Sequence, residues 1–137
     1  MARDLFHDLV RAGLEAEGWR VTDDPYVLKV DDLKFQIDLA AERVIAAEKD
    51  QQKIAVEIKS FLNPSAITDF YGALGQFLSY RLVLRQMEPE RTLYLAVPFD
   101  LYDNFFQSRF AKSAISEYEL RLVVYNSVEG GLVKWIG

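Results

Sequence analysis

The sequence contains no cysteine and only one histidine, His7, among its 137 residues. The lack of cysteine excludes disulfides, thiolate zinc sites and a cysteine nucleophile. A single histidine excludes His-rich metal sites and the HExxH motif, and it allows a Ser-His-Asp triad only through His7. Any metal site built from these side chains must therefore rest on carboxylates.

Signals for membranes, secretion and common cofactors are also missing. No apolar run reaches about 18 residues, and residues 1–10 carry acids where a secretory signal has an apolar core. The formal net charge is −5, so DNA contact would require a local basic patch. No Gly-rich phosphate loop is present, which leaves little support for a small-molecule enzyme. We expect a cytoplasmic protein that does not bind membranes.

The remaining composition is typical of one globular domain. Half of the residues are hydrophobic and 27% are charged, a balance that excludes a disordered chain. The length fits a single domain over residues 1–137.

Hydrophobic spacing predicts an α/β fold with a mixed sheet. The expected helices cover 3–18, 63–87 and 101–113, and the expected strands cover 26–30, 34–46, 53–60, 91–97, 120–126 and 132–136. Residues 40–47 also have helix propensity, but we favour a strand. Asn63 and Pro64 are expected to open the second helix and Asp100 to cap the third. Strands joined by turns must be antiparallel, and strands joined through a helix can be parallel.

Three charged residues, Asp38, Glu57 and Lys59, lie on predicted strands, opposite the large apolar side chains. If strands 34–46 and 53–60 are neighbours, the two carboxylates can converge at one edge of the sheet. Two carboxylates suit Mg²⁺ or Mn²⁺, and the carbonyl of Ile58 can add a ligand. Lys59 can then help to activate a metal-bound water or stabilise charge on a phosphate.

A solvated strand face would explain the same three residues without any function. The strand around Glu57 reads Ile-Ala-Val-Glu-Ile-Lys-Ser, which is too apolar for an edge strand. A charged pair in a half-buried strand costs free energy unless it is paired or functional. This context favours a functional site.

The pattern Asp38…Glu57-Ile58-Lys59 within the order αβββαβ resembles the PD-(D/E)xK nuclease superfamily. The whole chain is similar to the XisH family, the fdxN-element excision controlling factors of cyanobacteria. The stretches that carry this similarity are 2–10, 18–19, 24–25, 37–42, 54–61, 73–77 and 93–98. The resemblance implies a restriction-endonuclease-like core followed by a helix and a β-hairpin. Asp38 and Glu57 would be the metal ligands and Lys59 the catalytic lysine, although Ile37 replaces the proline that often precedes the first acid.

The resemblance also implies supporting residues. Gln76 and Tyr80 match a Gln-x-x-x-Tyr pattern that faces the active site and the phosphate backbone in nucleases of this fold. His7 is either a proton shuttle or phosphate contact, or a partly exposed helix residue without function. Acids of the first helix can complete such sites, and the candidates are Asp4, Asp8 and Glu15.

Two functions remain open at this stage. One is control of the excision of a DNA element through metal-dependent endonuclease activity, with DNA and an XisI-like companion protein as partners. The other is a regulatory, partner-binding module on the same fold without catalysis, which the acidic net charge favours. The aromatic residues within 99–110 are expected mainly in the core, with a homodimer interface as the alternative.

Overall fold

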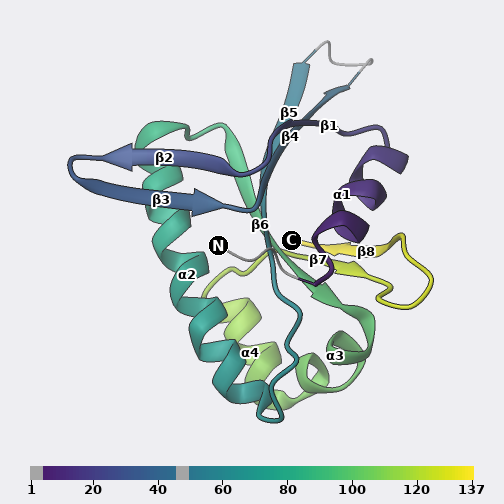
Figure 1. The fold of residues 1–137 in the computed structure, drawn as a ribbon. Helices are drawn as coiled ribbons and strands as arrows, with labels where there is room; N and C mark the ends of the chain where they lie inside the picture. Colours follow the sequence, from purple (N-terminus) through teal and green to yellow (C-terminus); the bar gives the residue numbers. More distant parts are fainter. Residues whose placement is uncertain (1–4, 46–49) are drawn as a thin grey trace.

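The computed structural model describes residues 5–45 and 50–137. Its six-stranded mixed sheet has the order β1-β4-β5-β6-β7-β8, and β2 and β3 form a separate two-stranded sheet (Figure 1). The elements are α1 (His7–Ala16), β1 (Arg20–Asp23), β2 (Tyr26–Val30), β3 (Leu33–Ile37), β4 (Leu39–Ile45), β5 (Asp50–Ile58), α2 (Ala66–Met87), β6 (Arg91–Pro98), α3 (Phe99–Asp103), η1 (Phe105–Gln107), α4 (Arg109–Glu117), β7 (Leu122–Tyr125) and β8 (Leu132–Ile136). Among these helices, none combines the length and apolar character that crossing a membrane requires.

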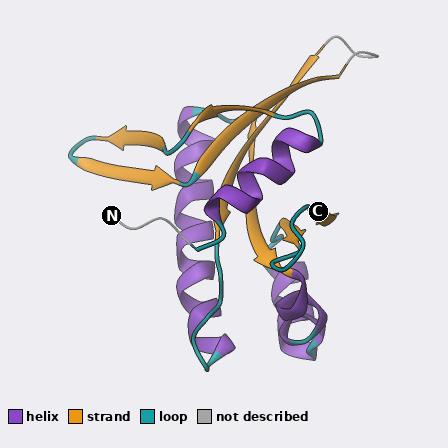
Figure 2. Cartoon of the chain, turned by 45° about the vertical axis from the view of Figure 1, so that its right-hand side comes forward, coloured by secondary structure: helices purple, strands orange, loops and turns teal. Residues whose placement is uncertain are grey.

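The pairing of the strands confirms the predicted mixed sheet. β4 and β5 are antiparallel neighbours, whereas β5, β6 and β7 run parallel and are joined through helices. Alternating side chains of β5 serve two cores. Ile54 and Val56 pack with α1 residues such as Leu14, while Ala55 packs with Phe70 of α2. The sheet therefore separates α1 from α2 and α4, and Figures 1 and 2 show α1 and α2 on its opposite sides.

The strand predicted over 34–46 is broken at Asp38. Residues before this point belong to the β2–β3 hairpin, where Ile37 pairs with Tyr26, and residues after it enter the large sheet, where Leu39 pairs with Val56. The backbone N–H of Asp38 donates to the Glu57 side chain instead of to a neighbouring strand. This bend moves Asp38 out of a regular strand and turns it toward Glu57.

Other boundaries also differ from the prediction. Ser65, not Asn63, caps α2, because its hydroxyl accepts from the N–H of Thr68. The helix predicted over 101–113 is divided into α3, η1 and α4, and Ser108 caps α4. The short strand β1 is not among the predicted strands. Helix α1 starts at His7, and the predicted residues 3–4 and 46 lie outside the described part of the chain.

The aromatic residues within 99–110 divide between the core and the surface. Phe106 is buried, and Tyr102 and Phe105 are half-buried against the same core. Phe99 and Phe110 are exposed, so these two aromatic residues do not belong to the core. Phe110 lies in the first turn of α4, where its ring packs against that of Phe70.

A buried arginine connects the two sheets. Arg91 is 6% exposed and begins β6. Its guanidinium donates to the carbonyl of Ile54 at 2.9 Å and to Glu88 at 2.6 Å, and it also pairs with Glu42 at 3.2 Å. It stacks on the ring of Tyr26, whose hydroxyl donates to Glu88. Arg91 thus holds the β2–β3 hairpin against β5 and the end of α2.

We expect Arg91→Met to destabilise the fold by about 2–4 kcal/mol, because it leaves Glu88 and Glu42 without their buried cation. Urea unfolding followed by circular dichroism measures this difference. Arg20→Met is the matched control, since Arg20 is exposed and also pairs with Glu42, at 3.6 Å. Its cost should stay below about 1 kcal/mol. Equal losses in both variants would contradict the assigned role of Arg91.

Candidate functional site

The two predicted carboxyl groups meet at one end of the β4–β5 pair. The N–H of Asp38 donates to Glu57 Oε1 at 3.2 Å, and the N–H of Ile58 donates to Asp38 Oδ2 at 2.8 Å. The carboxyl group of each acid therefore accepts a hydrogen bond from the backbone beside the other acid. The antiparallel register, with Leu39 opposite Val56, brings Asp38 and Glu57 face to face.

Burial changes the acid–base behaviour of this pair. Glu57 is 5% exposed, and its pKa is raised to about 8, first by burial and then by the negative charge of Asp38. Burial also raises the pKa of Asp38, while the hydrogen bond from the N–H of Ile58 and the nearby His7 act in the opposite direction. Without a bound cation, the pair therefore holds a proton near neutral pH.

Lys59 and Tyr80 lie beside the acid pair, as predicted. Lys59 Nζ is 3.5 Å from Glu57 Oε2. The pKa of Tyr80 is raised to about 12 by burial and by the negative charges of Glu57 and Asp38, so its hydroxyl keeps its proton. The ring of Phe35 packs edge-on against Tyr80 and links the β2–β3 hairpin to this side of α2.

Gln76 faces the same region from α2. It lines a pocket of about 550 Å³ together with Lys59. Its Oε1 is buried and has no hydrogen-bond partner among the described residues. A buried acceptor without a donor is costly, which is consistent with a partner supplied by a ligand or water.

His7 is buried, not partly exposed. It belongs to a row of hydrogen-bonded side chains that the sequence reasoning missed. Its Nε2 lies 2.8 Å from Asp24 Oδ1, and Arg11 donates to Asp24 Oδ2 at 2.6 Å. Its Nδ1 has no hydrogen-bond partner within residues 5–45 and 50–137. Asp24 is not among the predicted site residues, because its spacing from His7 carries no periodic signal that would connect them.

Of the three first-helix acids proposed as site residues, the structure describes Asp8 and Glu15. Glu15 is exposed and pairs with Arg11 at 3.7 Å. Asp8 is exposed, and Asp4 lies outside the described residues. Ile58 contributes its N–H to Asp38, while its side chain is buried on the α1 side of the sheet.

The donor set fits a small divalent cation. Among the described side chains, no group of three or more His, Asp or Glu residues is arranged to hold a metal ion. Mg²⁺, however, commonly takes only one or two carboxylates, with water and substrate phosphate as its other ligands. The pair of Asp38 and Glu57 offers that number, and a cation would offset the cost of ionising both.

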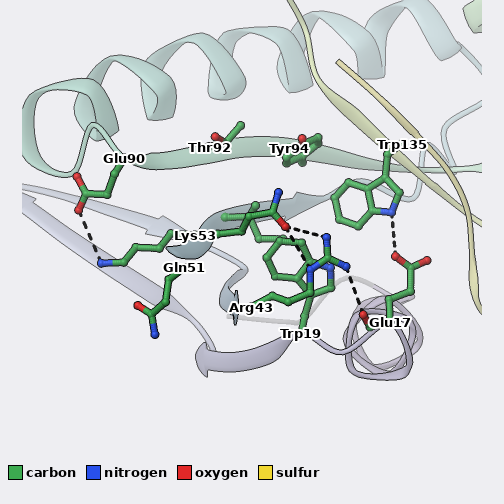
Figure 3. Close-up of a pocket in the computed structure, with 11 residues that line it drawn as sticks. Glu17, Trp19, Arg43, Gln51, Lys53, Glu90, Thr92, Tyr94 and Trp135 are labelled. Atoms are coloured by element: carbon green, nitrogen blue, oxygen red, sulfur yellow. Dashed lines mark hydrogen bonds and ion pairs between the residues drawn. The ribbon is translucent and has the colours of Figure 1, made fainter. Parts of the chain in front are cut away.

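A second pocket, of about 560 Å³, lies at the opposite end of β5 and β6 (Figure 3). Its charged and polar groups largely satisfy one another. Arg43 stacks on Trp19 with 4.4 Å between guanidinium and ring centre, and Trp135 donates to Glu17 at 3.0 Å. Since this pocket has no buried acid pair, it does not compete with Asp38 and Glu57 as a site of metal chemistry.

Comparison with known proteins places the chain in a family. The sequence profile described as "XisH protein" matches residues 1–133. The chain belongs to the XisH family. A crystal structure of an XisH family protein from Nostoc punctiforme PCC 73102 is 44% identical, with a TM-score of 0.88, and the match covers 98% of this chain and 100% of that one.

A second XisH structure gives the same result. The crystal structure of an fdxN element excision controlling factor protein from Anabaena variabilis is 45% identical, with a TM-score of 0.88 over 98% of this chain and 100% of that one. No protein with a curated description is significantly similar. The recognition of the XisH family from the sequence is therefore confirmed.

The raised pKa of Glu57 predicts a stability that falls as pH rises. Below about pH 4.5, the ordinary value, the carboxyl group holds its proton in both the folded and the unfolded chain, so the full stability is present. Between that value and about 8, only the folded chain keeps the proton, and stability is lost progressively. Urea unfolding in EDTA at several pH values measures this slope.

Glu57→Gln should flatten this slope and be more stable than the wild type by about 2–4 kcal/mol near pH 8. Glu129→Gln, in the exposed turn before β8, is the control and should behave like the wild type. A wild-type protein whose stability does not fall over this range would contradict a buried, protonated Glu57.

Proposed function

We propose that this XisH protein hydrolyses phosphodiester bonds of DNA with a divalent metal ion bound by Asp38 and Glu57. The observation that carries the proposal is the buried carboxyl pair with Lys59 Nζ only 3.5 Å from Glu57. Acids on two antiparallel strands, a lysine two residues after the second acid and a following helix with Gln76 and Tyr80 match the PD-(D/E)xK arrangement.

Each residue has a separate role in this proposal. An ion bound by the two carboxylates supplies positive charge for the attacking water and for the phosphate. Lys59 orients the water and stabilises the negative charge that develops on phosphorus-bound oxygens. Tyr80, whose pKa is raised to about 12, acts as a neutral hydrogen-bond donor to the backbone phosphate. His7, which contacts Asp24, favours the ionised form of Asp38.

The reaction is a hydrolysis in which water adds to phosphorus and the bond to one ester oxygen breaks. The leaving oxygen takes a proton, and the products are a phosphomonoester and a hydroxyl group. The relative of known structure from Anabaena variabilis is an fdxN element excision controlling factor protein. We propose the same role in DNA rearrangement for this chain, together with an XisI-like companion protein.

A second function is a regulatory module that works through a partner without cutting DNA. The net charge of −5 favours this alternative, because an acidic surface binds the DNA backbone weakly on its own. The companion protein would then supply the basic surface. Here the acid pair would have a structural role in joining β4 to β5.

The cleavage proposal is tested with plasmid and branched DNA in Mg²⁺ or Mn²⁺, with and without the companion protein. We expect cleavage that EDTA abolishes and that Asp38→Asn and Lys59→Met each reduce by at least roughly 100-fold. Glu129→Gln is the control and should retain full activity. Far-UV circular dichroism checks that each variant folds.

Absence of cleavage on every substrate would contradict the catalytic function. If the companion protein still co-elutes with both the wild type and Asp38→Asn, the regulatory module is the correct function. Cleavage that persists equally in both site variants would instead point to a contaminating nuclease.

A further inference from the structure

Helix α2 is apolar on more sides than the fold covers. Its residues 70–80 include no charged side chain. Phe70 and Phe77 are buried against the sheet. A surface helix normally presents one apolar stripe to the core and polar residues to solvent. Figures 1 and 2 show α2 along one side of the molecule, with the β2–β3 hairpin reaching past it.

The uncovered side carries a continuous row of large apolar residues, here called the outer stripe. Its members follow helical spacing along the full length of α2, and they are Ile67, Tyr71, Leu74, Leu78 and Leu82. Tyr71 is 61% exposed and Leu82 is 58% exposed, while Leu74 and Leu78 are half-buried. Contiguous exposed apolar surface of this kind marks an interaction site.

The order of residues in the outer stripe fits a second copy of the same helix as its partner. If a second copy of α2 lies antiparallel to the first, with the twofold axis between Leu74 and Gly75, position 67 meets 82, and position 71 meets 78. Four members of the stripe then face another member from the second copy, and Leu74 faces Gly75, which has no side chain and leaves room for it. An isologous interface requires this self-complementarity, because the same patch serves both subunits. An unrelated partner would not require the two ends of the stripe to match each other.

Gly75 lies at the centre of this arrangement. A Cβ atom at this position would have no neighbour within 4 Å, so the fold of one chain does not require a glycine there. A glycine inside a helix costs about 1 kcal/mol relative to alanine. Its absence of a side chain would allow two helix backbones to approach closely at the axis.

The neighbouring surface of α4 extends the stripe in the same order. The exposed Phe110 packs against Phe70 near the start of α2, with ring centres 5.9 Å apart. The exposed Tyr118 lies near the end of α2, where Arg81 donates to its carbonyl at 2.9 Å. The same twofold axis would bring Phe110 of one copy toward Tyr118 of the other. This adds area toward the roughly 800 Å² per subunit of a stable interface.

We propose that the outer stripe of α2 joins two copies of this chain in an antiparallel, twofold-symmetric homodimer. The inference does not depend on DNA cleavage, since none of the residues in the stripe belongs to the acid pair. It also differs from an interface centred on residues 99–110, because Phe106 and its neighbours mostly fill the core.

Sedimentation equilibrium over a range of protein concentrations tests the dimer. We expect the wild type to be a dimer and Leu82→Glu and Tyr71→Glu each to raise the dissociation constant by at least roughly 100-fold, because a charge would be buried at each symmetric contact. Val128→Glu is the matched control, since Val128 is 89% exposed in the turn before β8, and it should remain a dimer. Thermal unfolding checks that all variants fold.

A cysteine placed at the axis gives a second, independent test. The chain contains no cysteine, so Gly75→Cys introduces a single thiol. Mild oxidation should link two copies through this residue, whereas Val128→Cys should stay largely unlinked. A wild-type monomer at all concentrations, or a dimer that Leu82→Glu leaves intact and Gly75→Cys does not link, would overturn the proposal. The proposal would also be overturned if the outer stripe became protected from solvent only when a different protein was added.

Discussion

The site depends on two reciprocal hydrogen bonds between the segments that carry Asp38 and Glu57. Each carboxyl group accepts a backbone N–H from the strand that carries the other. The exchange places two acids in a buried position, where they are costly to ionise together. It also fixes the point at which the chain leaves the β2–β3 hairpin and enters the large sheet. One local arrangement therefore determines both the topology near β4 and the chemistry available there.

The chain stabilises this arrangement from three directions. Lys59 approaches Glu57 from the end of β5, Tyr80 approaches from α2, and His7 approaches from α1 with Asp24 behind it. These elements belong to different faces of the sheet. Helices α1 and α2 pack on the two faces, whereas Lys59 directly follows β5 within the sheet. None of the residues in the outer stripe of α2 belongs to the acid pair, so the proposed dimer and the proposed site chemistry use different residues.

The sequence could predict the site where its signal was local. The alternation of Ile54, Val56 and Ile58 assigns Glu57 to the opposite face, and the pairing of neighbouring strands brings Asp38 near it. The bend at Asp38 could not be predicted, because residues 33–45 alternate like one strand and only tertiary pairing divides them. The link between His7 and Asp24 was missed for a similar reason. It joins a helix to a turn, and no periodic pattern connects such positions.

The most direct test of the account is a crystal grown near pH 8 and soaked in Mn²⁺, with anomalous scattering used to locate the ion. We expect one manganese ion bound by carboxylate oxygens of both Asp38 and Glu57, with Lys59 beside it, and no ion in Glu57→Gln. The contrary result is a wild-type crystal in which Mn²⁺ is absent or bound elsewhere while the two carboxyl groups remain hydrogen-bonded to the opposite strands. That outcome would leave the pair as a structural joint between β4 and β5.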